Sequence, residues 1–146
     1  MAMEDLWPDD VASTKAIAPV NIVREQGLML GKKTRNKVLG KVEKAETYGR
    51  LFSFSFVIEA PALGYSYELF TFTYGVDLYP VTVKPDDEMR SELGSEPYEI
   101  EVKSEEEFTQ ILKRIFSSRK ARKVITALLA QMENKQDESV ENSVQF

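Results

Sequence analysis

The stretch RLFSFSFVIEAP, residues 50–61, alternates large apolar and small polar side chains with a period of two. Ser53 and Ser55 separate the aromatic positions and share the opposite side. Such alternation is typical of a half-buried antiparallel strand whose apolar side needs a covering layer. The apolar positions on the shared side are Phe52, Phe54, Phe56 and Ile58.

Residues 65–75, YSYELFTFTYG, repeat this pattern and are predicted to pair with the first stretch. Phe70, Phe72 and Tyr74 would face the core, so cross-strand aromatic pairs would add to the stability of the sheet. The period of two then places the remaining side chains on the other face. These are Tyr67, Leu69, Thr71 and Thr73.

Three more strands are expected, at 36–49, 79–85 and 98–103, with a loop over 86–97. The strand at 79–85 is short and bounded by prolines, which predicts a position at the edge of the sheet.

Helices are expected on both sides of these strands in the chain. Pro19 suits the first position of a helix with Ile22, Val23, Met29 and Leu30 on one side. Ser104 and Glu107 form a capping box before a second helix, and a third carries the apolar residues up to Met132. The sequence therefore predicts an α+β fold, an antiparallel sheet of about five strands with one N-terminal and two C-terminal helices packed on it.

The two ends of the chain are acidic and poor in large apolar residues. We predict a mobile arm over 1–14, one domain over 15–133 and a disordered tail over 134–146. Trp7, the single tryptophan, interrupts the arm and has two interpretations. It is either a latch onto the chain's own core or an anchor for a partner, since tryptophan is enriched at interface hot spots.

The chain contains no cysteine and no histidine. It therefore lacks the residues of zinc–thiolate sites, the commonest general base and the commonest transition-metal ligand. No pattern calls for a cofactor or a metal, and we expect a protein that is not an enzyme. No apolar run is long enough to cross a bilayer, and the first residues lack the features of a signal peptide, so a cytoplasmic location is expected.

Charge is sorted along the chain, although the net charge is only −5. Residues 24–50 carry eight bases and three acids, residues 113–123 carry six bases and no acid, and residues 84–107 carry ten acids and three bases. A surface divided in this way favours oriented contact with a partner or with a second copy of the chain.

The basic segments 32–44 and 113–123 support an alternative function as a nucleic-acid-binding module, because lysine and arginine contacts to phosphates supply most non-specific affinity. The overall acidity of the chain argues against it. The candidate contacts are Lys32, Lys33, Arg35, Lys37, Arg119, Lys120, Arg122 and Lys123.

A remote alternative comes from Pro85–Asp86 and, farther on, Glu101–Val102–Lys103. This pattern resembles the signature of restriction-type nucleases, in which two carboxylates hold a divalent metal and the lysine helps activate water. A charged, exposed strand face explains the same residues more simply.

Protein–protein interaction is the function that the sequence favours. Tyrosines near strand ends and hydroxyl-bearing strand faces both suit such contacts. We expect a small cytoplasmic inhibitor, immunity-like or antitoxin-like factor, adaptor or subunit that self-associates, with no membrane contact. The candidate contact residues are Trp7, Ser53, Ser55, Tyr65, Tyr67 and Tyr79.

Overall fold

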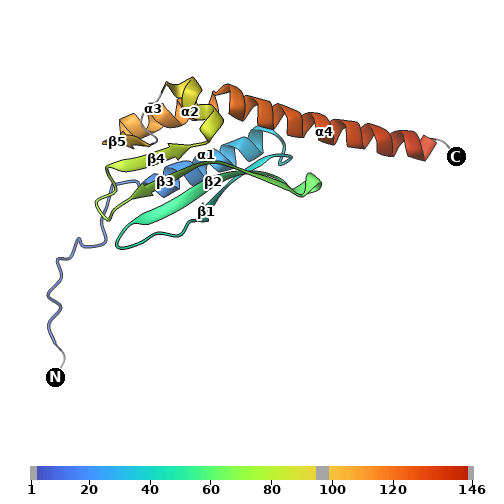
Figure 1. The fold of residues 1–146 in the computed structure, drawn as a ribbon. Helices are drawn as coiled ribbons and strands as arrows, with labels where there is room; N and C mark the ends of the chain where they lie inside the picture. The colour runs from blue at the N-terminus through green and yellow to red at the C-terminus, as the bar shows by residue number, and fades with distance from the viewer. Residues whose placement is uncertain (1–2, 95–98, 145–146) are drawn as a thin grey trace.

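The computed structural model describes residues 3–94 and 99–144 and contains one sheet and four α-helices (Figure 1). A short 3-10 helix, η1 (Pro61–Leu63), joins two of the strands. The helices are α1 (Pro19–Lys33), α2 (Asp87–Leu93), α3 (Glu105–Phe116) and α4 (Arg119–Val144). The strands are β1 (Leu39–Lys44), β2 (Phe52–Ala60), β3 (Tyr65–Tyr74), β4 (Val81–Pro85) and β5 (Ile100–Val102).

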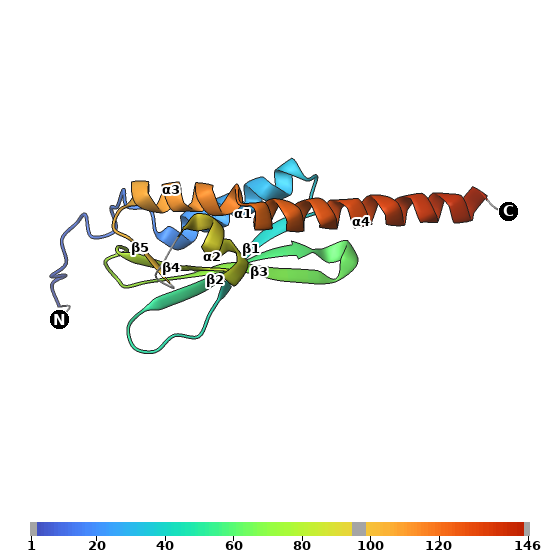
Figure 2. The ribbon, with the colours of Figure 1, turned by 45° about the horizontal axis from the view of Figure 1, so that its top comes forward.

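The sheet is an antiparallel meander in which each strand pairs with the next along the chain, in the order β1-β2-β3-β4-β5. The helices α1, α3 and α4 lie over the same face of this sheet (Figure 2). The α+β fold predicted from the sequence is confirmed.

Phe54 and Phe56 form the sheet side of the core together with Phe70 and Phe72, as predicted, whereas Phe52 at the start of β2 stays 46 % exposed. Phe56 stacks on Phe70 across the β2–β3 pair with ring centroids 5.4 Å apart, and Phe54 stacks on Phe72 at 5.5 Å. Phe72 also contacts Phe108 of α3 at 5.9 Å. These ring contacts join the sheet to the helical layer, and each aromatic pair adds roughly 0.5–1.5 kcal/mol beyond the burial of its area.

A β-bulge in the β2–β3 pair changes which residues of β3 face the core. Phe56 pairs with Phe70, but Val57 pairs with Glu68, so Leu69 is the extra residue. Leu69 is buried in the core, and Tyr67 packs against that core. The prediction that Leu69 and Tyr67 lie on the opposite face was therefore wrong, because one extra residue shifts the period of two.

Two glycines let α1 lie directly on β1. A Cβ atom added at Gly27 would lie 2.3 Å from the carbonyl oxygen of Gly40. One added at Gly40 would lie 2.6 Å from both Gly27 Cα and the ring of Phe56. Gly27, which lowers helix propensity, is therefore at the closest approach of helix and strand.

The segment after β3 departs from the prediction in two ways. Strand β4 lies between β3 and β5 rather than at an edge, and Pro85 is accommodated because β5 pairs only with residues 81–83. The expected loop contains helix α2. Asp86 caps this helix by accepting a hydrogen bond from Glu88 N at 2.8 Å, and its buried residues are Met89 and Leu93.

The strongest local signal in the sequence is confirmed. Ser104 Oγ accepts a hydrogen bond from Glu107 N at 3.1 Å, and the Glu107 carboxylate accepts one from Lys103 N at 2.7 Å. In the strand expected at 98–103, Val102 of β5 faces the core, while Tyr98 lies outside the described residues.

The two ends of the chain extend away from the sheet (Figures 1 and 2). Residues 3–17 form an arm without regular helix or strand, and the first helix begins at Pro19. Helix α4 runs to Val144, so its backbone includes most of the segment that the sequence predicted to be a disordered tail.

Substitution of Gly27 tests the contact between α1 and β1. Alanine is favoured over glycine inside a helix by about 1 kcal/mol, so Gly27→Ala would stabilise an unconstrained helix. Here we expect a decrease in the free energy of unfolding of about 1–3 kcal/mol, because the new methyl group meets backbone atoms. Urea denaturation measures the change.

Gly75→Ala is the matched control, because its nearest neighbour would be a Leu51 methyl group at 3.9 Å. We expect its effect to stay within about 0.5 kcal/mol. A Gly27→Ala variant that is more stable than the wild-type protein would contradict the proposed contact.

Candidate partner-binding groove

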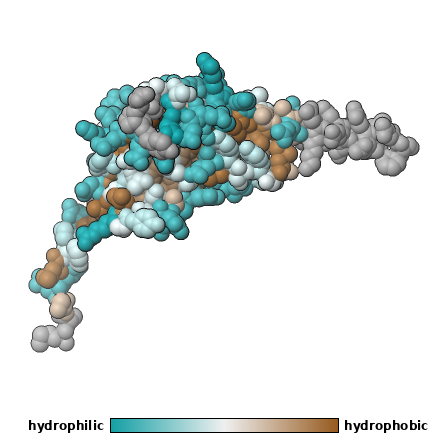
Figure 3. Space-filling view, viewed as in Figure 1, coloured by the Kyte–Doolittle hydropathy of each residue, from teal (hydrophilic) through white to brown (hydrophobic). Residues whose placement is uncertain are grey.

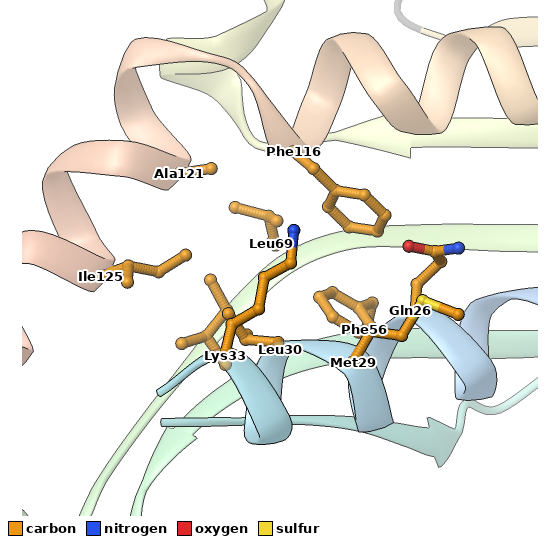
Figure 4. A pocket seen from close by; sticks show the side chains of 10 residues that line it. Gln26, Met29, Leu30, Lys33, Phe56, Leu69, Phe116, Ala121 and Ile125 are labelled. Carbon is orange, nitrogen blue, oxygen red and sulfur yellow. The ribbon is translucent and has the colours of Figure 1, made fainter. Parts of the chain in front are cut away.

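A hollow of about 230 Å³ lies between α1 and the α3–α4 corner, over the helical face of the sheet (Figure 4). Phe116 and Ile125 form one wall, and Met29 and Leu30 form the opposite wall. The floor comes from the sheet. Its members are Phe56, Ile58 and Leu69.

A second hollow, of about 320 Å³, continues along α1 toward its first turn. It shares the lining residues Gln26 and Phe116 with the first, so the two hollows are neighbours, and we call them together the groove. The additional lining residues are Ile22, Thr109, Leu112, Lys113 and Ser117.

The groove exists because two separate sets of contacts hold its walls. Helix α1 is seated on β1 by the Gly27–Gly40 approach, while the ring of Phe116 packs on Phe56 at 5.4 Å and on Phe70 at 6.1 Å. The floor residues are almost fully buried, whereas Met29 keeps 44 % of its surface exposed. The groove therefore has a buried floor and an exposed rim.

The charged part of the lining is basic. Lys33 extends across the first hollow in Figure 4, and Lys113 lines the second. Among the described residues that line both hollows, none is an aspartate or glutamate. An apolar surface with a positive rim can accept apolar side chains that are flanked by carboxylates.

The groove was not predicted from the sequence. Met29 and Leu30 were expected on one side of the helix with Ile22 and Val23. Helix α1 contacts β1 mainly through other positions, so Met29 and Leu30 also line the groove. The apolar stripe of α1 is wider than the part of the helix that is buried against the sheet. This difference was the signal in the sequence that could have indicated the groove. The buried seat consists of Val20, Val23, Gly27 and Gly31.

Trp7 does not latch onto the core in this structure. Its side chain is 72 % exposed, and Leu6 beside it is 82 % exposed. Figure 3 shows hydrophobic residues of the arm at the surface, away from the sheet and helices. Of the two interpretations of Trp7, the arrangement fits the anchor rather than the latch.

Tyr67, Asp86, Lys120 and Glu88 form a polar network that fixes the start of α4. The Tyr67 hydroxyl donates to the Asp86 carboxylate, and Lys120 Nζ lies 5.2 Å from the centre of the Tyr67 ring. Lys120 also pairs with Glu88 of α2 at 2.9 Å. Since Ala121, the next residue, lines the groove, this network holds the α4 wall in place.

The environment of this network raises two pKa values. Burial, and then the Asp86 carboxylate, raise the pKa of Tyr67 to about 12. The hydrogen bond to Glu88 is the main cause of the raised pKa of Lys120. Both effects favour the protonated side chains that the network uses.

The remaining tyrosines are placed differently. Tyr65 is exposed near the β2–β3 turn. Tyr79 packs its ring on Phe108, and its buried hydroxyl has no hydrogen-bond partner among the described residues. Burial raises the pKa of both Tyr79 and the core residue Tyr74.

Ser53 and Ser55 lie on the face of the sheet opposite the helices, and their hydroxyl groups form hydrogen bonds within that face. Ser53 Oγ and Thr73 Oγ1 share a hydrogen bond at 2.9 Å, and Ser55 Oγ donates to Glu68 at 3.0 Å. These cross-strand bonds give the face a polar surface that needs no partner to complete its hydrogen bonding.

The basic and acidic segments of the sequence partly meet within the molecule. Besides the Lys120–Glu88 pair, the Arg119 backbone N–H donates to the Glu92 carboxylate, with distances of 2.9 and 3.0 Å to its two oxygens. Arg114 donates to the Leu93 carbonyl at 2.8 Å. Some of the charge that predicted an external partner thus joins α2 to the α3–α4 corner.

The other candidate nucleic-acid contacts lie in two groups. One group surrounds the end of α1 and contains Lys32, Lys33, Arg35 and Lys37. Arg122 and Lys123 are exposed on the first turns of α4. Nucleic-acid binding stays a prediction.

The nuclease-like pattern is not assembled into a site. Asp86 bonds Tyr67 on the helical side of the sheet, whereas Glu101 pairs with Thr82 on the exposed face. Within 3–94 and 99–144, no cluster of three or more acidic residues is placed to hold a metal ion.

Comparison with protein-family models, with curated proteins and with solved structures gives no match to this chain. Among the described helices, none combines the length and the apolar character needed to span a membrane.

The Tyr67 network predicts a specific loss of stability at high pH. An unfolded tyrosine ionises near 10, whereas folded Tyr67 ionises at about 12. Its stabilising effect is therefore complete below pH 10 and is lost as the pH rises toward 12. We expect the free energy of unfolding of the wild-type protein to fall more steeply over this interval than that of Tyr67→Phe.

Urea denaturation at a series of pH values above 9, with both proteins side by side, measures this difference. Tyr67→Phe retains the other tyrosines and Lys120, so their ionisation affects both proteins and does not explain a difference between the two curves. Parallel pH curves would show that Tyr67 does not couple to folding.

Proposed function

We propose that this protein is a non-catalytic interaction module, and that the groove between α1 and α3–α4 binds apolar side chains of an acidic protein segment. The observation that carries the proposal is the combination of an apolar floor with two lysines, Lys33 and Lys113, at its rim. This surface supports binding to a protein rather than a reaction, since its lining is mainly apolar and no hydrogen bond joins a lining hydroxyl to a lining lysine among the described residues.

The size of each hollow is compatible with the same choice. Pockets for drug-sized ligands and cofactors typically measure about 300–1,000 Å³. Taken singly, the hollows of about 230 and 320 Å³ are below or near the lower end of this range. They suit individual large side chains that project from a partner segment, in the manner of hot-spot residues entering pockets.

Site-specific photo-crosslinking tests the proposal. A photoreactive phenylalanine analogue in place of Met29, in the full chain expressed in its native cells, would face the groove. We expect protein adducts, and we expect mass spectrometry to map them to a segment where apolar residues adjoin aspartate or glutamate.

Leu28 provides the matched control, because it is 65 % exposed on the same helix but does not line the groove. The same analogue at position 28 should give few or none of these adducts. Equal adducts at both positions, or none at position 29, would contradict the proposal. Adducts that disappear on nuclease treatment would favour the nucleic-acid alternative instead.

A further inference from the structure

We propose that the partner segment for the groove is the acidic arm of a second copy of this chain, with Trp7 and Leu6 as its anchors. This inference rests on the proposed function of the groove. It follows from three properties of the arm, namely its exposed apolar side chains, its charge and its direction.

The arm exposes more apolar surface than a solvated segment requires. Trp7 and Leu6 are adjacent in the sequence and almost entirely exposed, and Val11 is 60 % exposed farther along. A buried tryptophan side chain removes about 150–250 Å² from solvent, so its transfer into a groove is strongly favourable. The groove offers the matching surface in Met29 and Phe116.

The charges of the two surfaces are complementary. Four carboxylates flank the anchors, and the lining of the groove carries Lys33 and Lys113 but no acidic side chain. An arm docked through Trp7 would bring its carboxylates to the basic rim, which favours this segment over a neutral one. The flanking carboxylates are Glu4, Asp5, Asp9 and Asp10.

The course of the arm favours a second copy as the acceptor. The arm leads away from the body of its own chain in both ribbon views (Figures 1 and 2). Two turns shorten it between Trp7 and α1, with hydrogen bonds from Val11 N to the Pro8 carbonyl at 3.2 Å and from Ser13 N to the Asp10 carbonyl at 2.9 Å. If two copies exchange arms, each groove holds the arm of the other copy. The result is a closed dimer with two-fold symmetry.

The single tryptophan makes the test direct, because all tryptophan fluorescence comes from the arm. With the full chain, we expect the emission of Trp7 to shift to shorter wavelength as the protein concentration rises. Light scattering on the same samples should show the molar mass doubling over the same interval. High salt should weaken this association, since it screens the carboxylate–lysine contacts.

Met29→Glu and Leu28→Glu are the paired variants, because the two residues are neighbours on α1 and only Met29 lines the groove. Both side chains are well exposed, so both variants should fold. We expect Met29→Glu to weaken dimerisation about tenfold or more, and Leu28→Glu to leave it close to the wild-type value.

The inference is overturned if the protein stays monomeric with a long-wavelength emission at all concentrations. It is also overturned by a monomer with a short-wavelength emission, which would mean that the arm occupies its own groove, or by equal effects of the two variants. If position 29 nevertheless cross-links to a different protein in cells, the proposed function stands and only the choice of partner is wrong.

Discussion

The contact between Gly27 and Gly40 determines how the rest of the molecule is arranged. It allows backbone atoms of α1 and β1 to meet, which would be sterically forbidden with a Cβ atom at either position. The axis of helix α1 therefore lies unusually close to strand β1. The aromatic side chains of α3 cover the following strands, and the gap between the two helical walls becomes the groove.

Helix α2 and the polar network around Tyr67 hold the α3–α4 wall of the groove in place. Asp86 both caps α2 and accepts a hydrogen bond from the Tyr67 hydroxyl. The Lys120 ammonium ties the start of α4 to Glu88, and the Arg119 backbone N–H ties it to Glu92. The strong charge segregation of the sequence thus has a structural role at this corner. The basic side chains at the groove, Lys33 of α1 and Lys113 of α3, line the two hollows, where they can meet an acidic partner.

The sequence predicted the fold well because local patterns specified it. Alternating phenylalanines defined the sheet core, and Ser104 with Glu107 defined the start of α3. The errors have equally physical causes. One bulge at Leu69 moved Tyr67 to the helical face, and α2 has only two apolar residues to reveal it. The groove was not predictable, because it depends on the spacing between helices that are far apart in the chain.

Because the chain has no native cysteine, engineered cysteines can test whether the arm of one copy lies in the groove of another. Chains carrying Pro8→Cys, next to the anchor, are mixed under mild oxidation with chains carrying Lys33→Cys at the groove or Lys32→Cys just outside it. We expect the disulfide-linked heterodimer to form preferentially with Lys33→Cys. Equal yields from Lys33→Cys and Lys32→Cys would contradict it.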